Sequence, residues 1–162
     1  MQSCEKGPKR TNGGHTIKTK SYKKGEDPKK PTKQISYSIK MRKNNGVYYV
    51  PIKVNGVDME FIFDTGASDI TISLVEAMFL YKQGTLTDED IIGSQYYQTA
   101  DGNIHEGTVI NLKTVQIADK TLNNVRASVV DNMDAPLLLG QSALSKFGTV
   151  SIDYSNNTIT FK

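Results

Sequence analysis

Asp64 is the residue of this chain whose surroundings most clearly indicate chemistry. It ends the apolar run Phe61-Ile62-Phe63 and is followed at once by Thr65, Gly66 and two further small residues. An apolar run of this kind is typical of a buried strand, so Asp64 is expected where that strand enters a tight turn. A carboxylate in such a place is costly to bury unless it is paired or used. The sequence therefore indicates Asp64 as a candidate catalytic acid.

The other residues that hydrolases use as nucleophiles or bases are scarce. The chain has two histidines, His15 and His105, and one cysteine, Cys4, and none of them forms a recognisable triad pattern with serine. No metal-ligand spacing occurs, so we expect no metal site. A phosphate-binding glycine loop is also missing from the sequence. These observations favour a chemistry based on carboxylates.

One carboxylate is not enough to hydrolyse a peptide bond, because the reaction needs a base for water and an acid for the carbonyl oxygen. Two carboxylates held about 3 Å apart share one proton and do both. The sequence offers only Asp64 in this setting. A two-fold axis is the simplest source of a second acid, so we expect a homodimer in which two Asp64 residues face each other.

The residues after Asp64 suit such an arrangement. Gly66 allows the backbone to turn tightly and to approach a partner. The Thr65 hydroxyl is able to hydrogen-bond across to the partner's turn and fix the two acids. Ala67 and Ser68 are small enough to leave room for an extended peptide.

Strands are expected to position Asp64, because apolar and polar residues alternate with a period of two along much of residues 34–162. Asn55-Gly56 predicts a tight hairpin before the strand that ends in Asp64, and Asp101-Gly102 predicts another. The remaining strands are expected over Ile35–Met41, Val47–Val54, Asp69–Ser73, Tyr96–Ala100, Asn103–Val115, two strands within Thr121–Val130, Pro136–Gly140, Thr149–Tyr154 and Thr158–Lys162.

Two short helices are expected between the strands. Ser73 followed by Glu76 is a capping box, which predicts a helix directly after it. A second helix is expected over Gln141–Phe147, with Leu144 and Phe147 inward. The first helix is expected to direct four apolar residues inward: Leu74, Val75, Met78 and Phe79. Many short strands with one or two short helices predict an all-β domain that is closed or sandwiched.

The first 33 residues differ in composition from the rest. Residues 1–43 carry 13 Lys and Arg against three acids, whereas residues 44–162 carry 7 against 14. Residues 1–33 have almost no large aliphatic side chains, so we expect a basic, disordered tail or linker before a domain over 34–162. The alternative for the tail is a polybasic contact with an anionic membrane surface or with nucleic acid. The acidic domain argues against nucleic acid beyond such a contact.

The sequence does not fix the compartment. Its longest apolar runs fall far short of the roughly 18 residues that a membrane span needs. No signal peptide is visible at the start of the printed chain. A membrane anchor or an export signal upstream of Met1 stays open.

The residues around Asp64 also carry a resemblance. Phe63-Asp64-Thr65-Gly66-Ala67-Ser68, followed later by Leu138-Leu139-Gly140, resembles the retropepsin family of aspartic proteases. The chain is more closely similar to the single-domain retropepsin-like proteases of bacteria, and the likeness covers roughly Gly46 to Lys162. The resemblance implies a closed, barrel-like β fold and a homodimer with one catalytic aspartate per subunit. It also implies peptide or protein substrates and no cofactor.

The resemblance assigns a role to individual positions. Asp64 takes the catalytic role, and Thr65, Gly66 and Gly140 support its turn. The hairpin at Asp101-Gly102 falls where the family has its flap, a mobile lid over the substrate. The C-terminal strand, Thr158–Lys162, falls where the family builds part of its dimer sheet. The positions expected to contact substrate are Ala67, Ser68, Asp69, Ala100, Asp101, Gly102 and Leu138.

Side-chain pockets are expected to be lined by Ile70, Ile104 and Leu138, whereas Tyr96 and Tyr97 are expected to pack on the sheet, with substrate contact as the alternative. Retroviral members often have Asp at the position of Ser68 and Arg at that of Gln141, and both charges are absent here. Two functions therefore stay open. The first is a dimeric aspartic endopeptidase, and the second is a catalytically silent relative that binds peptides or partners as a dimer.

Overall fold

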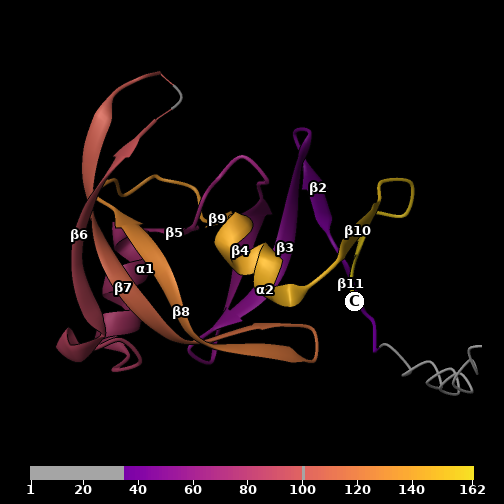
Figure 1. Ribbon diagram of the computed structural model, residues 1–162, viewed down its shortest axis with the longest axis horizontal. Coiled ribbons are helices and arrows are strands. Elements are labelled where there is room, and N and C mark those ends of the chain that lie inside the picture. Colours follow the sequence, from indigo (N-terminus) through magenta and orange to yellow (C-terminus); the bar gives the residue numbers. More distant parts are fainter. Residues whose placement is uncertain (1–34, 100) are drawn as a thin grey trace, which may run out of the picture. The chain divides into compact units, whose positions relative to one another are not determined.

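Strands make up most of the fold and form two sheets, as the all-β prediction required (Figure 1). The computed structural model describes residues 35–99 and 101–162, which fall within one compact unit, Lys33–Lys162. The predicted tail, residues 1–33, and the predicted substrate contact Ala100 lie outside the described residues.

The larger sheet has eight strands. In spatial order they are β2 (Arg42–Asn44), β3 (Val47–Val54), β4 (Val57–Phe63), β9 (Leu138–Leu139), β5 (Ile70–Ser73), β8 (Lys120–Val130), β7 (Ile104–Ile117) and β6 (Ile91–Gln98). β3 also pairs with β7, where Lys53 is opposite Gln116. This second pairing joins strands from distant parts of the sheet and curls it at one end. Full closure of the barrel stays a prediction.

The hairpin between β3 and β4 is the one that Asn55-Gly56 predicts. Both residues have positive φ, 48° and 85°, as a two-residue turn of this kind requires. The Asn55 side chain also ties the hairpin to the rest of the sheet. Its Oδ1 accepts from the Thr114 amide on β7 at 3.0 Å, and its Nδ2 donates to the Thr85 carbonyl at 3.0 Å.

The smaller sheet has three strands, β1 (Tyr37–Lys40), β11 (Thr158–Phe161) and β10 (Val150–Asp153), with β11 in the middle. Because side chains alternate along a strand, the register sorts them onto two faces. One face carries only apolar and aromatic residues: Tyr37, Ile39, Val150, Ile152, Ile159 and Phe161. The other face carries only polar ones: Ser38, Lys40, Ser151, Asp153, Thr158 and Thr160.

The first helix, α1 (Leu74–Lys82), begins where the capping box predicts. The Ser73 hydroxyl accepts from the amide of Val75 and bonds the Glu76 carboxylate. The predicted inner face was wrong except at Leu74, which packs partly buried against the core; Ala77 and Leu80 are the buried side chains. The residues predicted inward include Val75, Met78 and Phe79, which are exposed. Apolar side chains lie all round this segment, so its periodicity did not determine which side packs against β5 and β8.

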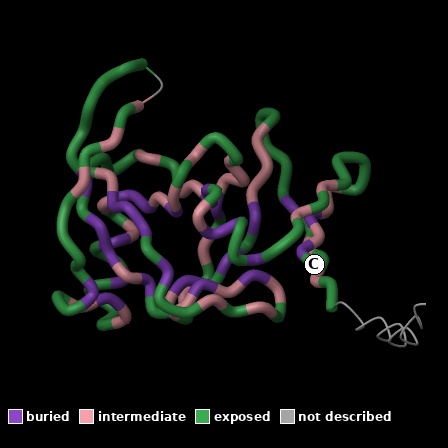
Figure 2. Tube along the Cα trace, viewed as in Figure 1, coloured by how far each residue is buried: buried purple, intermediate pink, exposed green. Residues whose placement is uncertain are grey.

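The second helix, α2 (Gln141–Phe147), confirms its prediction, and Leu144 and Phe147 are buried. The Phe147 ring packs on Phe161 of β11 with centroids 5.3 Å apart, which joins helix α2 to the smaller sheet. A turn of 3-10 helix, η1 (Asp88–Asp90), precedes β6. Buried residues run along the middle of the strands, whereas hairpin tips are exposed (Figure 2). Within the described residues, no helix has the length and apolar character to cross a membrane.

Two strand predictions needed correction. β6 begins at Ile91, earlier than predicted, and β8 is one strand where two were expected. β8 stays continuous because it pairs with β7 on one side and with β5 on the other.

The hairpin formed by β6 and β7 extends beyond the rest of the sheet (Figure 1). β7 pairs with β8 only as far as Gly107, and residues 104–106 pair with β6 alone. A Cβ atom at Gly107 would lie 2.8 Å from the Val129 carbonyl oxygen and 3.0 Å from the Tyr97 ring. The hairpin therefore leaves the sheet at a closely packed point.

Candidate active site

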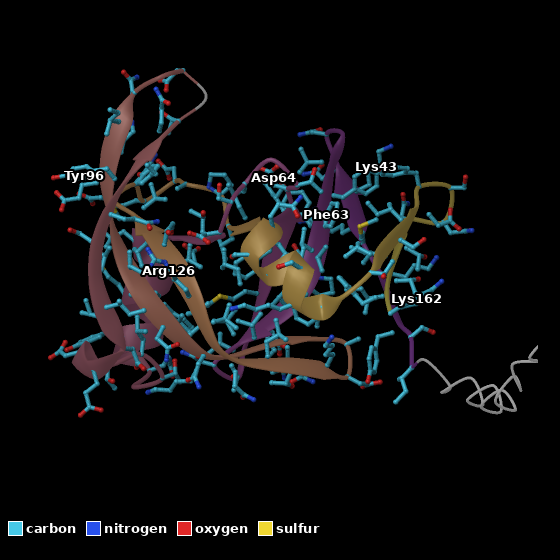
Figure 3. The ribbon with its side chains drawn as sticks, viewed as in Figure 1. Lys43, Phe63, Asp64, Tyr96, Arg126 and Lys162 are labelled. Carbon is cyan, nitrogen blue, oxygen red and sulfur yellow. The ribbon has the colours of Figure 1, made fainter. Side chains whose placement is uncertain are left out.

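The turn after β4 holds Asp64 between two neighbouring strands. β9 lies between β4 and β5, parallel to β4, with Phe63 opposite Leu139. The Asp64 amide donates to the Leu139 carbonyl at 3.3 Å, so the ladder continues up to the candidate acid. Asp64 is half-buried, and Figure 3 shows it beyond Phe63 at the end of the strand.

Gly66 contacts the Asp64 carboxylate directly. Its amide donates to Oδ1 at 2.8 Å, and a Cβ atom at Gly66 would lie 3.2 Å from the same oxygen. The φ angle of Gly66 is not among the positive ones. The need for glycine here therefore comes from the close approach of the carboxylate rather than from a left-handed turn.

Gly140 supports the turn from behind. A Cβ atom there would lie 2.7 Å from the Ala67 carbonyl oxygen and would also overlap that of Asp69. The next residues fasten the same segment, because the Gln141 amide donates to the Ala67 carbonyl at 2.9 Å. The Gln141 side chain donates to the Thr65 carbonyl at 3.0 Å. The start of helix α2 thus packs against the turn, and Gln141 holds the Thr65 and Ala67 carbonyls in place.

A cleft of about 540 Å³ opens above Asp64. Six of the residues predicted for the site line it, namely Asp64, Gly66, Ala67, Ser68, Asp69 and Leu138. Thr65 and Gly140 do not line it. Thr65 instead lines a second hollow of about 240 Å³, together with Phe63, Leu144 and Val150. The turn therefore presents Asp64 on the cleft side and Thr65 on a different side.

The β6–β7 hairpin forms the opposite wall of the cleft. Its lining residues are Gln95, Tyr97, Gln98 and Thr99. Asp101 and Gly102, at the tip, are not among the lining residues. The Asp101 carboxylate is bonded to the Thr99 hydroxyl and to the amide and side chain of Asn103. These bonds hold the pKa of Asp101 below its ordinary value and rigidify the tip.

Sequence reasoning did not single out Gln95 or Ser128, and for Tyr97 substrate contact was only the alternative to packing on the sheet. Tyr97 lines the cleft, with its ring 5.7 Å from that of His105, whereas Tyr96 is 74% exposed and points outward (Figure 3). The pKa of the Tyr97 hydroxyl is raised, mainly because the side chain is partly buried and secondly because the negative charge of Asp131 lies near. Gln95 donates to the Ser128 hydroxyl at 2.6 Å.

Along β6, Gln95 and Tyr97 alternate with Tyr96 and Gln98. That alternation did not indicate which face meets the cleft. Ser128 and Val130 reach the cleft because β8 pairs in parallel with β5, and no local pattern predicts that pairing.

The predicted side-chain pockets were partly wrong. Ile70 is fully buried in the core and Ile104 is 70% exposed on the hairpin, so neither lines the cleft. Leu138 does line it. Ile70 is drawn inward because β5 lies between β9 and β8 in the middle of the sheet.

The cleft is acidic. Asp64, Asp69 and Asp134 line it, and its described lining residues include no Lys or Arg. Nowhere in residues 35–99 and 101–162 do three or more His, Cys, Asp or Glu side chains gather as metal ligands would.

Comparisons with known proteins agree with the motif. A family model described as "gag-polyprotein putative aspartyl protease" matches residues 50–146. An uncharacterized protein of Rickettsia prowazekii (strain Madrid E) is 32% identical over 124 aligned residues, in a match that covers 74% of this chain and 49% of that protein. The chain thus spans about half the length of this curated relative.

The fold also resembles a solved structure. The crystal structure of a retropepsin-like aspartic protease from Rickettsia conorii superposes with a TM-score of 0.56 and 27% sequence identity. The match covers 78% of this chain and 90% of that one. With Asp64 in its turn, Gly140 behind it and the family model across both, the chain belongs to the retropepsin-like aspartic proteases.

Proposed function

We propose that this chain is an aspartic endopeptidase that hydrolyses peptide bonds with a water molecule held between two Asp64 carboxylates at a homodimer axis. The observation that carries this proposal is the position of Asp64. Its carboxylate stands at the floor of an open cleft, with one oxygen fixed by the Gly66 amide at 2.8 Å. A carboxylate that served only to cap its own turn would not need a cleft above it.

The proposed chemistry divides the two roles between the paired acids. The ionised carboxylate takes a proton from water as the water oxygen attacks the carbonyl carbon, and the protonated carboxyl gives its proton to the carbonyl oxygen. The carboxyl that took the water proton gives it to the amide nitrogen as the C–N bond breaks and the amine leaves. One diol hydroxyl returns its proton to the other carboxylate and becomes the carbonyl of the acid product, so the pair again shares one proton. Gly66 holds Oδ1 of each Asp64 in place, which leaves Oδ2 free for the water.

The homodimer is proposed because each copy supplies a single acid at the end of an apolar strand and at the start of the Asp-Thr-Gly turn, namely Asp64. Thr65 lies on the side of the turn away from the cleft. In a dimer that brings the two turns together, each Thr65 is in position to bond the partner's turn. Each copy then contributes one barrel-like half, as the family resemblance implies, and the complete substrate cleft spans both halves.

The proposed substrate is an extended peptide that lies between the turn and the β6–β7 hairpin. Ala67, Ser68, Asp69 and Leu138 form its floor. The hairpin acts as a flap, with Asp101 and Gly102 at its tip over the peptide. A cleft of about 540 Å³ in one copy falls within the roughly 300–1,000 Å³ of ordinary ligand sites. Strand-like pairing to floor and flap gives affinity that depends little on sequence.

The test is the exchange Asp64→Asn. We expect cleavage of a peptide library, followed by mass spectrometry, to disappear while the dimer and the folded state persist. The matched control is Asp58→Asn, because the Asp58 side chain is 84% exposed and pairs with Lys53 at the surface. Cleavage that continues unchanged in Asp64→Asn would exclude Asp64 as the catalyst. A wild-type dimer that binds peptides without cutting them would identify the silent relative.

A further inference from the structure

Ser128 is a buried polar residue in the middle of the larger sheet. It is 5% exposed, and it lines the proposed substrate cleft. The other buried polar or charged side chains of the described residues are Ser73 and Asp90, which cap helical turns. Ser128 has no such role, because it lies within β8, between β5 and β7. A buried hydroxyl is costly unless it is hydrogen-bonded, so the partner of Ser128 indicates what it is for.

That partner is Gln95 on β6, whose amide is held at both of its polar atoms. Its Nε2 donates to the Ser128 hydroxyl at 2.6 Å, and its Oε1 accepts from Nη2 of Arg126. Arg126 and Ser128 alternate along β8, so their side chains leave the same face of the sheet (Figure 3). Since β7 lies between β6 and β8, the Gln95 side chain reaches past one strand to bond two residues of another.

The guanidinium of Arg126 determines which way the Gln95 amide points. A guanidinium only donates hydrogen bonds, so the amide oxygen must face Arg126 and the amide nitrogen must face Ser128. Among the described residues no carboxylate forms an ion pair with Arg126, so none competes for it. The amide nitrogen carries two hydrogens, and Ser128 accepts one of them. No described residue accepts the other hydrogen or the Ser128 hydroxyl hydrogen.

This part of the cleft therefore offers two hydrogen-bond donors to a ligand. Thr71, which also lines the cleft, lies directly opposite Ser128 in the parallel pair of β5 and β8 and adds a third polar side chain. A substrate side chain that enters here is matched best by an acceptor oxygen. The cleft contains three aspartates and its described lining residues include no Lys or Arg, so a carboxylate is repelled. A neutral carboxamide fits both conditions.

We propose that Gln95, together with Ser128, selects a glutamine or asparagine side chain of the substrate, and that Arg126 is the positioning residue that orients the Gln95 amide. This inference rests on the proposed function, because it names a substrate class for the same cleft. A substrate side chain of similar size without a carbonyl leaves both donors unpaired. Sites built on hydrogen bonds discriminate strongly against such analogues, whereas apolar pockets discriminate weakly.

The first test measures the preference itself. Mass spectrometry of a cleaved peptide library should show glutamine or asparagine enriched at one fixed distance from the cut bond. In a cleaved peptide, glutamine at that position should give a kcat/KM about tenfold higher than methionine, which has a similar size, since each hydrogen bond contributes a few-fold. A ratio near one in wild type would overturn the inference.

Gln95→Glu is the sharpest variant, because it keeps the size of the side chain and its bond from Arg126 but removes the N–H donors. We expect the ratio of glutamine to methionine to fall to about one, and lysine at the same position to become preferred. Gln83→Glu is the matched control, because it adds the same charge at an exposed position after α1, outside the cleft. Retention of the wild-type ratio by Gln95→Glu would show that another residue selects the substrate.

Arg126→Met tests the positioning role, because Arg126 does not line the cleft. We expect kcat/KM to fall by about threefold or more for the glutamine peptide and to stay within about twofold for the methionine peptide. Arg126→Lys keeps one donor and should recover part of the preference. Equal losses for both peptides would show that Arg126 only supports the wall of the cleft.

Binding separates this inference from the proposed function. Asp64→Asn is expected to bind peptides without cutting them, so peptides that it retains from a random library should be rich in glutamine or asparagine, and those retained by Asp64→Asn/Gln95→Glu should not. If wild type cleaves through Asp64 but neither cleavage nor binding depends on Gln95, only this inference is wrong. If wild type binds through Gln95 and never cleaves, the proposed hydrolysis is wrong and the selected side chain stands.

Discussion

A Cβ atom at Gly140 would lie 2.7 Å from the carbonyl oxygen of Ala67. The backbone of Gly140 has φ of −92°, which any residue adopts, so the requirement for glycine is one of space alone. Ala67 belongs to the turn that begins at Asp64, and Gly140 immediately precedes helix α2. The close approach therefore couples the position of the helix to that of the candidate catalytic acid.

Gly140→Ala is expected to move the turn and to reduce cleavage more than stability. The overlap costs about 1–3 kcal/mol in the free energy of unfolding, as overpacking usually does. Urea unfolding and peptide cleavage measure the two effects. Ser142→Ala is the matched control, because its buried hydroxyl has no hydrogen-bond partner among the described residues and its loss should leave both quantities nearly unchanged. Wild-type cleavage by Gly140→Ala would show that the turn tolerates displacement.

Asp90 is expected to contribute to stability except in acid. Burial raises the pKa of Asp90, but bonds from Lys113, at 3.0 Å, and from the amide and hydroxyl of Thr87 outweigh it, and the pKa lies below its ordinary value of 3.8. Because the pKa of Asp90 is lower in the folded state than in the unfolded state, the ionised carboxylate stabilises the folded protein. This contribution is fully present at pH values above the unfolded-state pKa, and it is lost as the pH falls through the folded-state pKa.

Asp90→Asn should therefore lower the free energy of unfolding at pH 7 by about 1–3 kcal/mol and flatten its decline below pH 4. Denaturant titrations at several pH values measure both. Asp58→Asn, which breaks an exposed ion pair with Lys53, should cost at most about 1 kcal/mol. If the free energy of unfolding of Asp90→Asn fell below pH 4 as steeply as that of wild type, other carboxylates would be responsible for the loss of stability in acid.

The exposed side of α1 should tolerate polar residues. Met78 and Phe79 are 47% and 44% exposed, so Met78→Gln and Phe79→Gln should change the free energy of unfolding by about 0.5 kcal/mol or less. Leu80→Ala should cost about 2–5 kcal/mol, because Leu80 is fully buried. Urea titrations of the three variants measure these losses. If Met78→Gln and Phe79→Gln lost more free energy of unfolding than Leu80→Ala, the helix would pack on the side that its sequence predicted.

The acidic cleft should favour peptides with a basic side chain. Asp134 lines the cleft, and its loss should lower kcat/KM for a lysine-containing peptide up to about fivefold, the value of an exposed ion pair. The same peptide with norleucine in place of lysine should show no change. Asp119→Asn, in the exposed turn between β7 and β8, serves as the control variant. Equal losses for both peptides would indicate that Asp134 shapes the cleft instead of selecting charge.

Local sequence patterns predicted much of the fold and the floor of the site. Asn55-Gly56 gave the hairpin, Ser73 gave the start of α1, and the run ending in Asp64 gave the central turn, because each depends on neighbours within a few residues. The opposite wall of the cleft, with Tyr97 and Ser128, depends on how β5, β7 and β8 pair. Such pairing joins residues far apart in the chain, so alternation alone could not identify the face that meets Asp64.

The close packing at Gly107 has a consequence for the evolution of the hairpin. From Gly107 toward the tip, β7 and β6 pair only with each other. The pair Gly107–Val130, the last one shared with β8, fixes the register of the rest of the sheet. The hairpin is therefore attached to the rest of the sheet at its base alone. Residue pairs inserted or deleted near its tip would not shift any hydrogen-bonded pair in the rest of the sheet, so we expect the length of the hairpin to diverge among relatives while the floor of the candidate site stays constant.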